Sequence, residues 1–166
     1  MHGSGNMSEW LVVIGLAVSG LVSSPVIGGA FEIEGVTFAD TFQAGPLPMP
    51  LQGVGVAKFL RTIKVYVGAL YLAPGTKPER VLDDVPKRLE LSYFRAIQAG
   101  DFGRAAMKVL ADNVSPATIT RLKPRIEQLH RLYQDVKPGD RYGLTYLPGV
   151  GTELALNGER KGIVEG

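Results

Sequence analysis

The sequence contains no cysteine, which excludes disulfides, thiolate metal sites and a cysteine nucleophile. Its two histidines, His2 and His130, lie in distant regions, so they offer neither a zinc site nor a histidine-based catalytic triad. A glycine-rich phosphate loop is also missing, because Gly53–Gly55 and Gly149–Gly151 lack the further glycines and the strand–turn–helix context of a nucleotide fingerprint. We therefore expect no metal ion and no cofactor.

Excess charge is scarce as well. The net charge is only +2, and no basic run carries interleaved aromatic residues, so we expect no nucleic-acid partner. The acidic pairs Asp83–Asp84 and Glu32/Glu34 are typical of solvated turn and strand positions rather than of an acid–base site. No nucleophile can be identified.

Glycine and proline are abundant. The 166 residues include 21 glycines and 11 prolines, and 45% of the residues are hydrophobic. The length is that of one globular domain, and the many turn-forming residues favour a sheet-rich fold.

The first thirty residues hold no lysine or arginine but contain an apolar segment, Trp10–Ile27. Its central run is shorter than the roughly 20 residues that span a bilayer, which favours a secretory signal peptide with cleavage before Phe31. We expect residues 1–30 to be this signal peptide or an N-terminal hydrophobic segment, and the protein to be periplasmic or secreted. Contact with a membrane is then expected only through an uncleaved segment. The alternative is a buried structural helix.

The stretch Gly53–Leu72 is the centre of the predicted sheet. From Lys64 onward both alternating faces are largely apolar, which predicts a strand pair whose second strand is covered on both sides. Its first half carries the cations Lys58, Arg61 and Lys64, and its second half carries the hydroxyls of Tyr66 and Tyr71. An anionic or polar-headed ligand would meet these groups.

Short strands are expected on either side of this centre. Phe31–Phe38 predicts a first strand that bends at Gly35, Asp40–Gly45 a second short strand, and Pro46–Pro50 a turn or edge. Lys77–Asp84 predicts a two-turn helix.

The next strand is predicted over Lys87–Ile97. Arg95 falls on its apolar face, where an unpaired charge would cost several kcal/mol. We expect a structural ion pair, a strand end that reaches solvent, or a bound ligand anion.

Two helices and a β-meander complete the pattern. Apolar stripes predict a helix over Asp101–Asn113 and a second one after Ser115–Pro116, which Pro124 should break or kink. The meander is predicted over Arg141–Leu147, Thr152–Leu156 and Glu159–Val164, with a type I′ turn at Asn157–Gly158. Because the sequence stops just after a hairpin strand, we expect a further C-terminal element beyond Gly166.

The motifs KVYVGALYL, KPGDRYGLTYLPGVGT and ELALNG, within residues 31–166, resemble the bacterial chalcone-isomerase-like family. This resemblance implies an α+β fold, an open-faced β-sandwich in which a layer of helices covers one side of a long antiparallel sheet. It also implies a ligand cleft between the sheet and the helices. Related members include plant flavonoid isomerases, fatty-acid-binding proteins and non-catalytic homologues.

The resemblance argues against the plant activity. Ala57 stands where true isomerases place a catalytic arginine, and Phe102 stands where they place a tyrosine that orders water. Tyr66 replaces a family threonine and resembles the tyrosine of the fatty-acid-binding relatives. A helical asparagine has only an uncertain counterpart, Val109 or Asn113, and the last family site residue would lie beyond the end of the sequence.

Two functions follow from this comparison. The first is non-catalytic binding of a small amphiphile such as a fatty acid, whose anionic head group is held by Tyr66 with one cation. The alternative is an isomerase or intramolecular lyase for an unsaturated carbonyl compound, in which Lys58 or Arg61 replaces the missing arginine. A purely structural or partner-binding role is a further possibility. The expected ligand-binding residues are Tyr66, Lys58, Arg61, Arg95, Phe102 and Tyr71.

Overall fold

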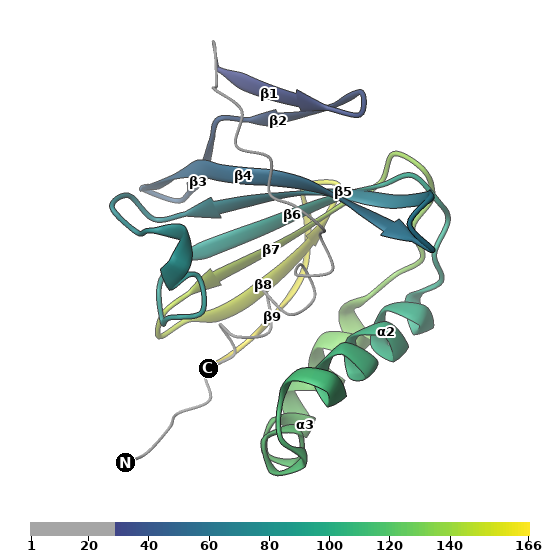
Figure 1. Ribbon diagram of the computed structural model, residues 1–166. Coiled ribbons are helices and arrows are strands. Elements are labelled where there is room, and N and C mark those ends of the chain that lie inside the picture. The colour runs from purple at the N-terminus through teal and green to yellow at the C-terminus, as the bar shows by residue number, and fades with distance from the viewer. Residues whose placement is uncertain (1–28) are drawn as a thin grey trace.

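The computed structural model describes residues 29–166, so the apolar segment expected to be a signal lies outside the described residues. The main element is a seven-stranded antiparallel sheet in which every strand pairs with its sequence neighbours (Figure 1). In spatial order its strands are β3 (Thr41–Ala44), β4 (Leu47–Phe59), β5 (Ile63–Leu72), β6 (Lys87–Tyr93), β7 (Arg141–Leu147), β8 (Gly151–Leu156) and β9 (Glu159–Val164).

Two helices, α2 (Ala99–Asn113) and α3 (Pro116–Leu132), cover one face of this sheet (Figure 1). Their apolar stripes and the inward side chains of β6 to β9 form the larger core, in which Leu110, Leu144 and Leu154 are almost completely buried. The expected α+β architecture, with a helical layer over a long antiparallel sheet, is thus confirmed. In the part of the chain that the structure describes, no helix is both long and apolar enough to cross a membrane.

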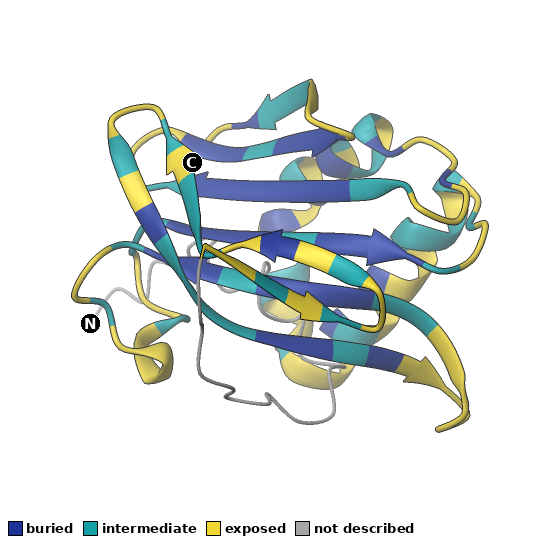
Figure 2. Ribbon diagram, turned by 90° about the horizontal axis from the view of Figure 1, so that it is seen from above, coloured by how far each residue is buried: buried dark blue, intermediate teal, exposed yellow. Residues whose placement is uncertain are grey.

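A separate hairpin covers the opposite face of the sheet. It consists of β1 (Ala30–Ile33) and β2 (Val36–Ala39) (Figure 1). Phe38 packs from it into a second core with Met49 and Val67. The middle of β5 is therefore buried from both sides, as its two apolar faces predicted. Figure 2 shows the resulting pattern, with buried residues along the strands and exposed ones in the connecting turns.

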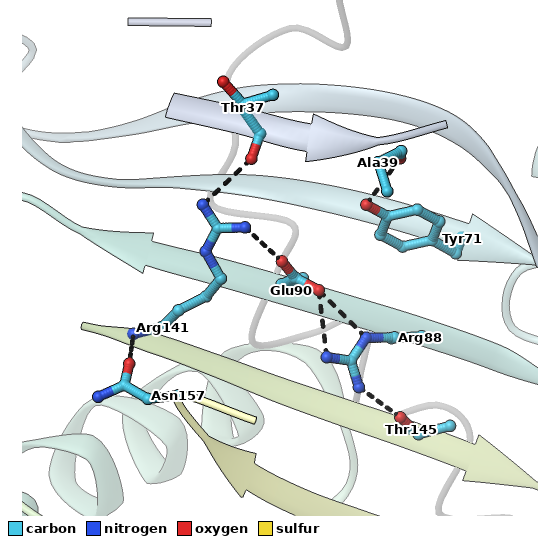
Figure 3. Close-up of polar contacts among 8 residues, drawn as sticks. All are labelled: Thr37, Ala39, Tyr71, Arg88, Glu90, Arg141, Thr145 and Asn157. Atoms are coloured by element: carbon cyan, nitrogen blue, oxygen red, sulfur yellow. Dashed lines mark hydrogen bonds and ion pairs between the residues drawn. The ribbon is translucent and has the colours of Figure 1, made fainter. Parts of the chain in front are cut away.

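A buried polar network fixes this hairpin to the sheet (Figure 3). The carboxylate of Glu90 accepts hydrogen bonds from Arg88 at 3.1 Å and from Arg141 at 2.7 Å. Arg141 also donates to the backbone carbonyl of Thr37 at 3.2 Å, and Arg88 donates to the hydroxyl of Thr145 at 2.7 Å. Each buried charge therefore has a partner, as burial of charged groups requires.

Several local predictions were wrong. The expected first strand is a hairpin, because Glu34 and Gly35 both adopt positive φ angles, 54° and 75°, and form a tight turn. The expected two-turn helix near residue 80 is a single 3₁₀ turn, Pro78–Arg80. Of the two outcomes expected for Pro124, a break does not occur, because α3 continues through it. Pro124 and Thr120, whose carbonyl loses its helical partner, are both exposed to water.

The strand expected over Lys87–Ile97 ends at Tyr93. Arg95 follows the strand end and is exposed, so the solvent alternative describes its position. The remaining residues reconnect only through an isolated bridge between Ile97 and Val136. Alternation beyond the true strand end therefore gave a wrong face for Arg95.

Candidate functional site

A cavity of about 350 Å³ lies between the sheet and the helices. Strands β4 to β7 supply its floor, and helix α2 with the end of α3 supplies the opposite wall. The lining is mostly apolar and aromatic: Ala57, Lys58, Phe59, Val65, Tyr66, Leu91, Tyr93, Ile97, Asp101, Phe102, Ala105, Ala106, Val109, Tyr133, Tyr142 and Leu144.

Five aromatic rings form a continuous cluster along this lining. Tyr66 and Tyr93 are direct neighbours across β5 and β6, while Tyr142 faces the same side from β7. Phe102 of α2 stacks on Tyr133, which directly follows α3, with ring centroids 5.0 Å apart. Edge-to-face contacts join Tyr93 to Phe102 at 5.6 Å and to Tyr142 at 6.0 Å. Strand alternation and the helical stripe thus bring residues far apart in sequence to one site.

The phenols of this cluster are neutral hydrogen-bonding groups. Burial raises the pKa of Tyr66 and raises the pKa values of Tyr93 and Tyr133 far above the usual tyrosine range. Burial also raises the pKa of Tyr142. Its hydroxyl donates to the backbone carbonyl of Gln134 at 2.8 Å and accepts from the backbone amide of Gln134 at 2.7 Å.

The hydroxyls of Tyr93 and Tyr133 differ from that of Tyr142. Within residues 29–166 neither makes a hydrogen bond, although both residues line the cavity. They are therefore available as donors to a ligand, because a buried hydroxyl is stabilised by a partner.

The structure brings only one of the three predicted binding cations to the cavity. The three consecutive residues Ala57, Lys58 and Phe59 all line the cavity, beside a register shift in β4 between Ala57 and Lys58, and Lys58 remains largely in solvent at the rim. Arg61 lies in the β4–β5 turn and Arg95 lies beyond β6; both are exposed and neither lines the cavity.

Of the two aromatic residues predicted to bind ligand beside Tyr66, only one lines the cavity. Phe102 lines the cavity, whereas Tyr71 lies on the opposite face of the sheet, where its hydroxyl donates to the Ala39 carbonyl at 3.0 Å (Figure 3). The prediction of Tyr71 as a residue of the same site as Tyr66 was wrong, because alternation along β5 places the two on opposite faces.

The remaining charge of the cavity wall belongs to Asp101, in the first turn of α2. Its carboxylate is paired with Arg104 one turn further on. Among the described residues, no group of histidine and acidic side chains could hold a metal ion.

A family model described as chalcone isomerase-like matches residues 30–166, which is most of the sequence. The chain belongs to the chalcone isomerase-like family. Among solved structures it is similar to a fatty-acid-binding protein of Arabidopsis thaliana, with a TM-score of 0.66 and 14% identity over 82% of each chain. At that identity the likeness concerns the fold. No curated protein matches the sequence.

Several residues at positions that the resemblance implies for the family site line this cavity. Ala57 and Phe102, which stand where the isomerases are expected to have arginine and tyrosine, both line the wall. Of the two candidates for the helical asparagine, Val109 lines the cavity, whereas Asn113 does not and instead donates to the Val109 carbonyl at 2.7 Å. The cavity wall thus carries methyl and phenyl groups at the positions where the resemblance implies polar ones in the isomerases.

Sequence reasoning did not identify Tyr93, Tyr133 and Tyr142 as site residues. Tyr93 was predicted only as part of an apolar strand face and Tyr133 as part of a helical stripe, while Tyr142 was predicted only as part of the strand Arg141–Leu147. The available signal was the number of tyrosines, rather than leucines or phenylalanines, on faces predicted to point inward. Tyrosine at such a position implies a partner for its hydroxyl.

Proposed function

We propose that this chalcone isomerase-like protein binds a small amphiphile, such as a fatty acid, without catalysing a reaction. The observation that carries the proposal is the apolar cavity in which two phenol donors, Tyr93 and Tyr133, make no hydrogen bond among the described residues. Its volume lies near the lower end of the roughly 300–1,000 Å³ range of small-molecule sites. The Arabidopsis structure with the same fold is described as a fatty-acid-binding protein, which supports this class of ligand.

The proposed ligand has an anionic head group near Lys58 and Tyr66 and an apolar tail along the helices. Lys58 is the one predicted binding cation that lines the cavity, and Tyr66 lines the same wall. The charge of Asp101 is compensated by Arg104, so it offers little repulsion to an anion. Apolar side chains of β6, β7 and α2 then surround the tail.

A fatty-acid titration tests this arrangement. A charge-assisted hydrogen bond contributes roughly 1.5–3 kcal/mol, and exposure of Lys58 favours the lower end, so Lys58→Ala should weaken binding about tenfold. Tyr66→Phe should weaken it about threefold to tenfold, as expected for a neutral hydrogen bond. Fatty acids of increasing length would show which tail the cavity accepts.

Arg61→Ala and Arg95→Ala are matched controls, because each removes an exposed cation that does not line the cavity. They should bind as wild type does. Circular dichroism would confirm that all variants are folded. Wild-type protein that binds no fatty acid at all would refute the proposal, and equal binding by all four variants would place the head group elsewhere.

We further propose that residues 1–30 direct the protein to the periplasm or the exterior. The family match begins at residue 30, so the apolar segment is separate from the family domain, which supports this role. Expression of the full chain in a bacterial host, followed by mass measurement of the protein from each compartment, tests it. Recovery of only uncleaved protein in the cytoplasm would contradict it.

A further inference from the structure

The tip of the β4–β5 hairpin exposes large apolar side chains. Phe59 is 60% exposed, Leu60 is 73% exposed and Ile63 is 36% exposed. The three lie within five consecutive residues, around a turn in which the Thr62 amide donates to the Phe59 carbonyl at 3.3 Å. Scattered exposed apolar residues are normal, but such a concentration at one projecting tip indicates an interaction surface.

The turn itself departs from ordinary sequence preference. Leu60 and Arg61 both have positive φ angles, 50° and 63°, at the two central positions of the turn. Asparagine and glycine are the residues that adopt this conformation readily, whereas a bulky leucine there is strained. The chain thus presents an apolar side chain at a position that local folding disfavours, which points to a function for the side chain.

Positive charge surrounds this apolar tip. Residues 58–64 contain Lys58, Arg61 and Lys64 and no carboxylate. Lys64 is paired with Glu34, while Lys58 and Arg61 are exposed. Apolar side chains that project between cations match the surface of a bilayer rich in anionic lipids, where the apolar groups enter the interface and the cations meet the head groups.

We propose that the β4–β5 hairpin tip docks this protein on anionic phospholipid membranes. Phe59 and Leu60 enter the interface, and Lys58 and Arg61 lie at the level of the head groups. Because Lys58 and Phe59 also line the cavity, docking brings the cavity rim to the bilayer. The docking does not depend on which ligand the cavity binds.

A single fluorescent label tests the position of the tip directly. The sequence has no cysteine, so Leu60→Cys in the full chain offers one site for an environment-sensitive dye. Val150→Cys is the matched control, since Val150 is 48% exposed and lies in the β7–β8 turn at the opposite end of the sheet. The probes are vesicles of phosphatidylcholine alone and of phosphatidylcholine with phosphatidylglycerol in equal amounts.

The label at residue 60 should shift to the blue on the anionic vesicles and be quenched by a quencher attached to the lipid tails. The shift should be smaller on neutral vesicles and at high salt, and it should be absent for the label at residue 150. A label at residue 60 that stays in water on both kinds of vesicle overturns the proposal and leaves a protein surface as the partner of the tip. Equal responses at residues 60 and 150 also overturn it.

Sedimentation of unlabelled protein with the anionic vesicles gives an independent measure. Phe59→Ser combined with Leu60→Ser should weaken partitioning about tenfold or more relative to Val150→Ser, because two apolar side chains are then lost from the interface. Arg61→Glu should weaken it as well, without removing a cavity residue. Melting curves would confirm folding of the variants. Unchanged partitioning of both the serine and the glutamate variants would contradict docking through this tip.

Discussion

Tyr66 of β5 lies directly opposite Tyr93 of β6, and their rings meet edge to face with centroids 5.8 Å apart. The pair forms part of the cavity wall and connects through Tyr93 to Phe102 of the helical layer. Sheet and helices are thus joined by aromatic rings at the place where the proposed ligand binds. Such contacts hold the rings and leave the hydroxyl of Tyr93 facing the cavity, where it is available for recognition.

The first prediction concerns the hydroxyl of Tyr93, which has no hydrogen-bond partner among residues 29–166. If it recognises the ligand, Tyr93→Phe should weaken fatty-acid binding by about 0.5–1.5 kcal/mol and leave the free energy of unfolding nearly unchanged. Isothermal titration and urea unfolding measure the two quantities.

Tyr142→Phe is the matched control for this prediction. Its hydroxyl bonds the backbone amide and carbonyl of Gln134, so its removal should destabilise the fold by about 1–3 kcal/mol. A Tyr93→Phe variant that binds as wild type does would show that this hydroxyl does not recognise the ligand, and one that loses as much stability as Tyr142→Phe would show a structural role.

Where local signals agreed, the fold could be predicted from the sequence. The meander β7–β9 follows from alternating strands joined at Asn157–Gly158, and both of these residues adopt the positive φ angles that the turn requires. An apolar stripe likewise predicted the helix after Ser115–Pro116, and the stripe residues Leu122, Ile126 and Leu129 of α3 are buried. These signals are local and depend on spacing alone.

The features that sequence analysis missed depend on less local information. The turn between β1 and β2 has a glutamate, Glu34, in a left-handed conformation that this residue rarely adopts, so Gly35 predicted only a bend and not a hairpin turn. Arg95 was misplaced because alternation does not show where a strand ends. Periodicity also placed Tyr93 inward without showing whether its hydroxyl would find a partner in the fold.

The second prediction concerns the network under the β1–β2 hairpin, in which Arg88 and Glu90 have side chains only 9% and 12% exposed. Glu90→Gln leaves two guanidinium groups without their carboxylate. Breaking a buried pair in this way costs about 3–5 kcal/mol, so the midpoint of urea unfolding should fall clearly.

Glu153→Gln provides the control for the network. Glu153 pairs with Arg160 at 3.4 Å in an exposed position, and exposed pairs contribute about 0–1 kcal/mol. Glu90→Gln should therefore lower the free energy of unfolding much more than Glu153→Gln does, by a difference well above the experimental error. Equal unfolding midpoints would mean that the buried network does not stabilise the hairpin.

The third prediction concerns His130 of α3, which packs closely against Gly103 of α2. Burial lowers the pKa of His130 below its usual value of 6.5, an effect that the charge of Glu127 only partly opposes. The unfolded chain therefore binds the proton more readily than the folded chain. Stability from the neutral imidazole is present above pH 6.5 and is lost as the pH falls through 6.5 towards the folded-state pKa.

Urea unfolding between pH 7.5 and pH 5.5 should show this loss in the wild type, at about the pH range of histidine titration. His130→Gln should have a flatter dependence, because the neutral amide does not titrate. Lower overall stability of the variant is compatible with the prediction, since the test concerns the slope. Equal slopes for both proteins would assign the pH dependence to other groups.

The last prediction concerns catalysis and rests on Ala57 and Phe102. Both line the cavity, at the positions where the isomerases are expected to supply a guanidinium and a phenol. Without a positioned cation the developing oxyanion lacks its main electrostatic stabilisation, which is commonly the largest catalytic contribution. Lys58 is the next residue and also reaches the cavity, but it lies largely in solvent at the rim, where screening weakens its field.

Cyclisation of a chalcone, followed by absorbance, should therefore proceed no faster with the protein than in buffer. Clear turnover that disappears in Lys58→Ala but persists in Arg95→Ala would contradict this and would support the isomerase alternative.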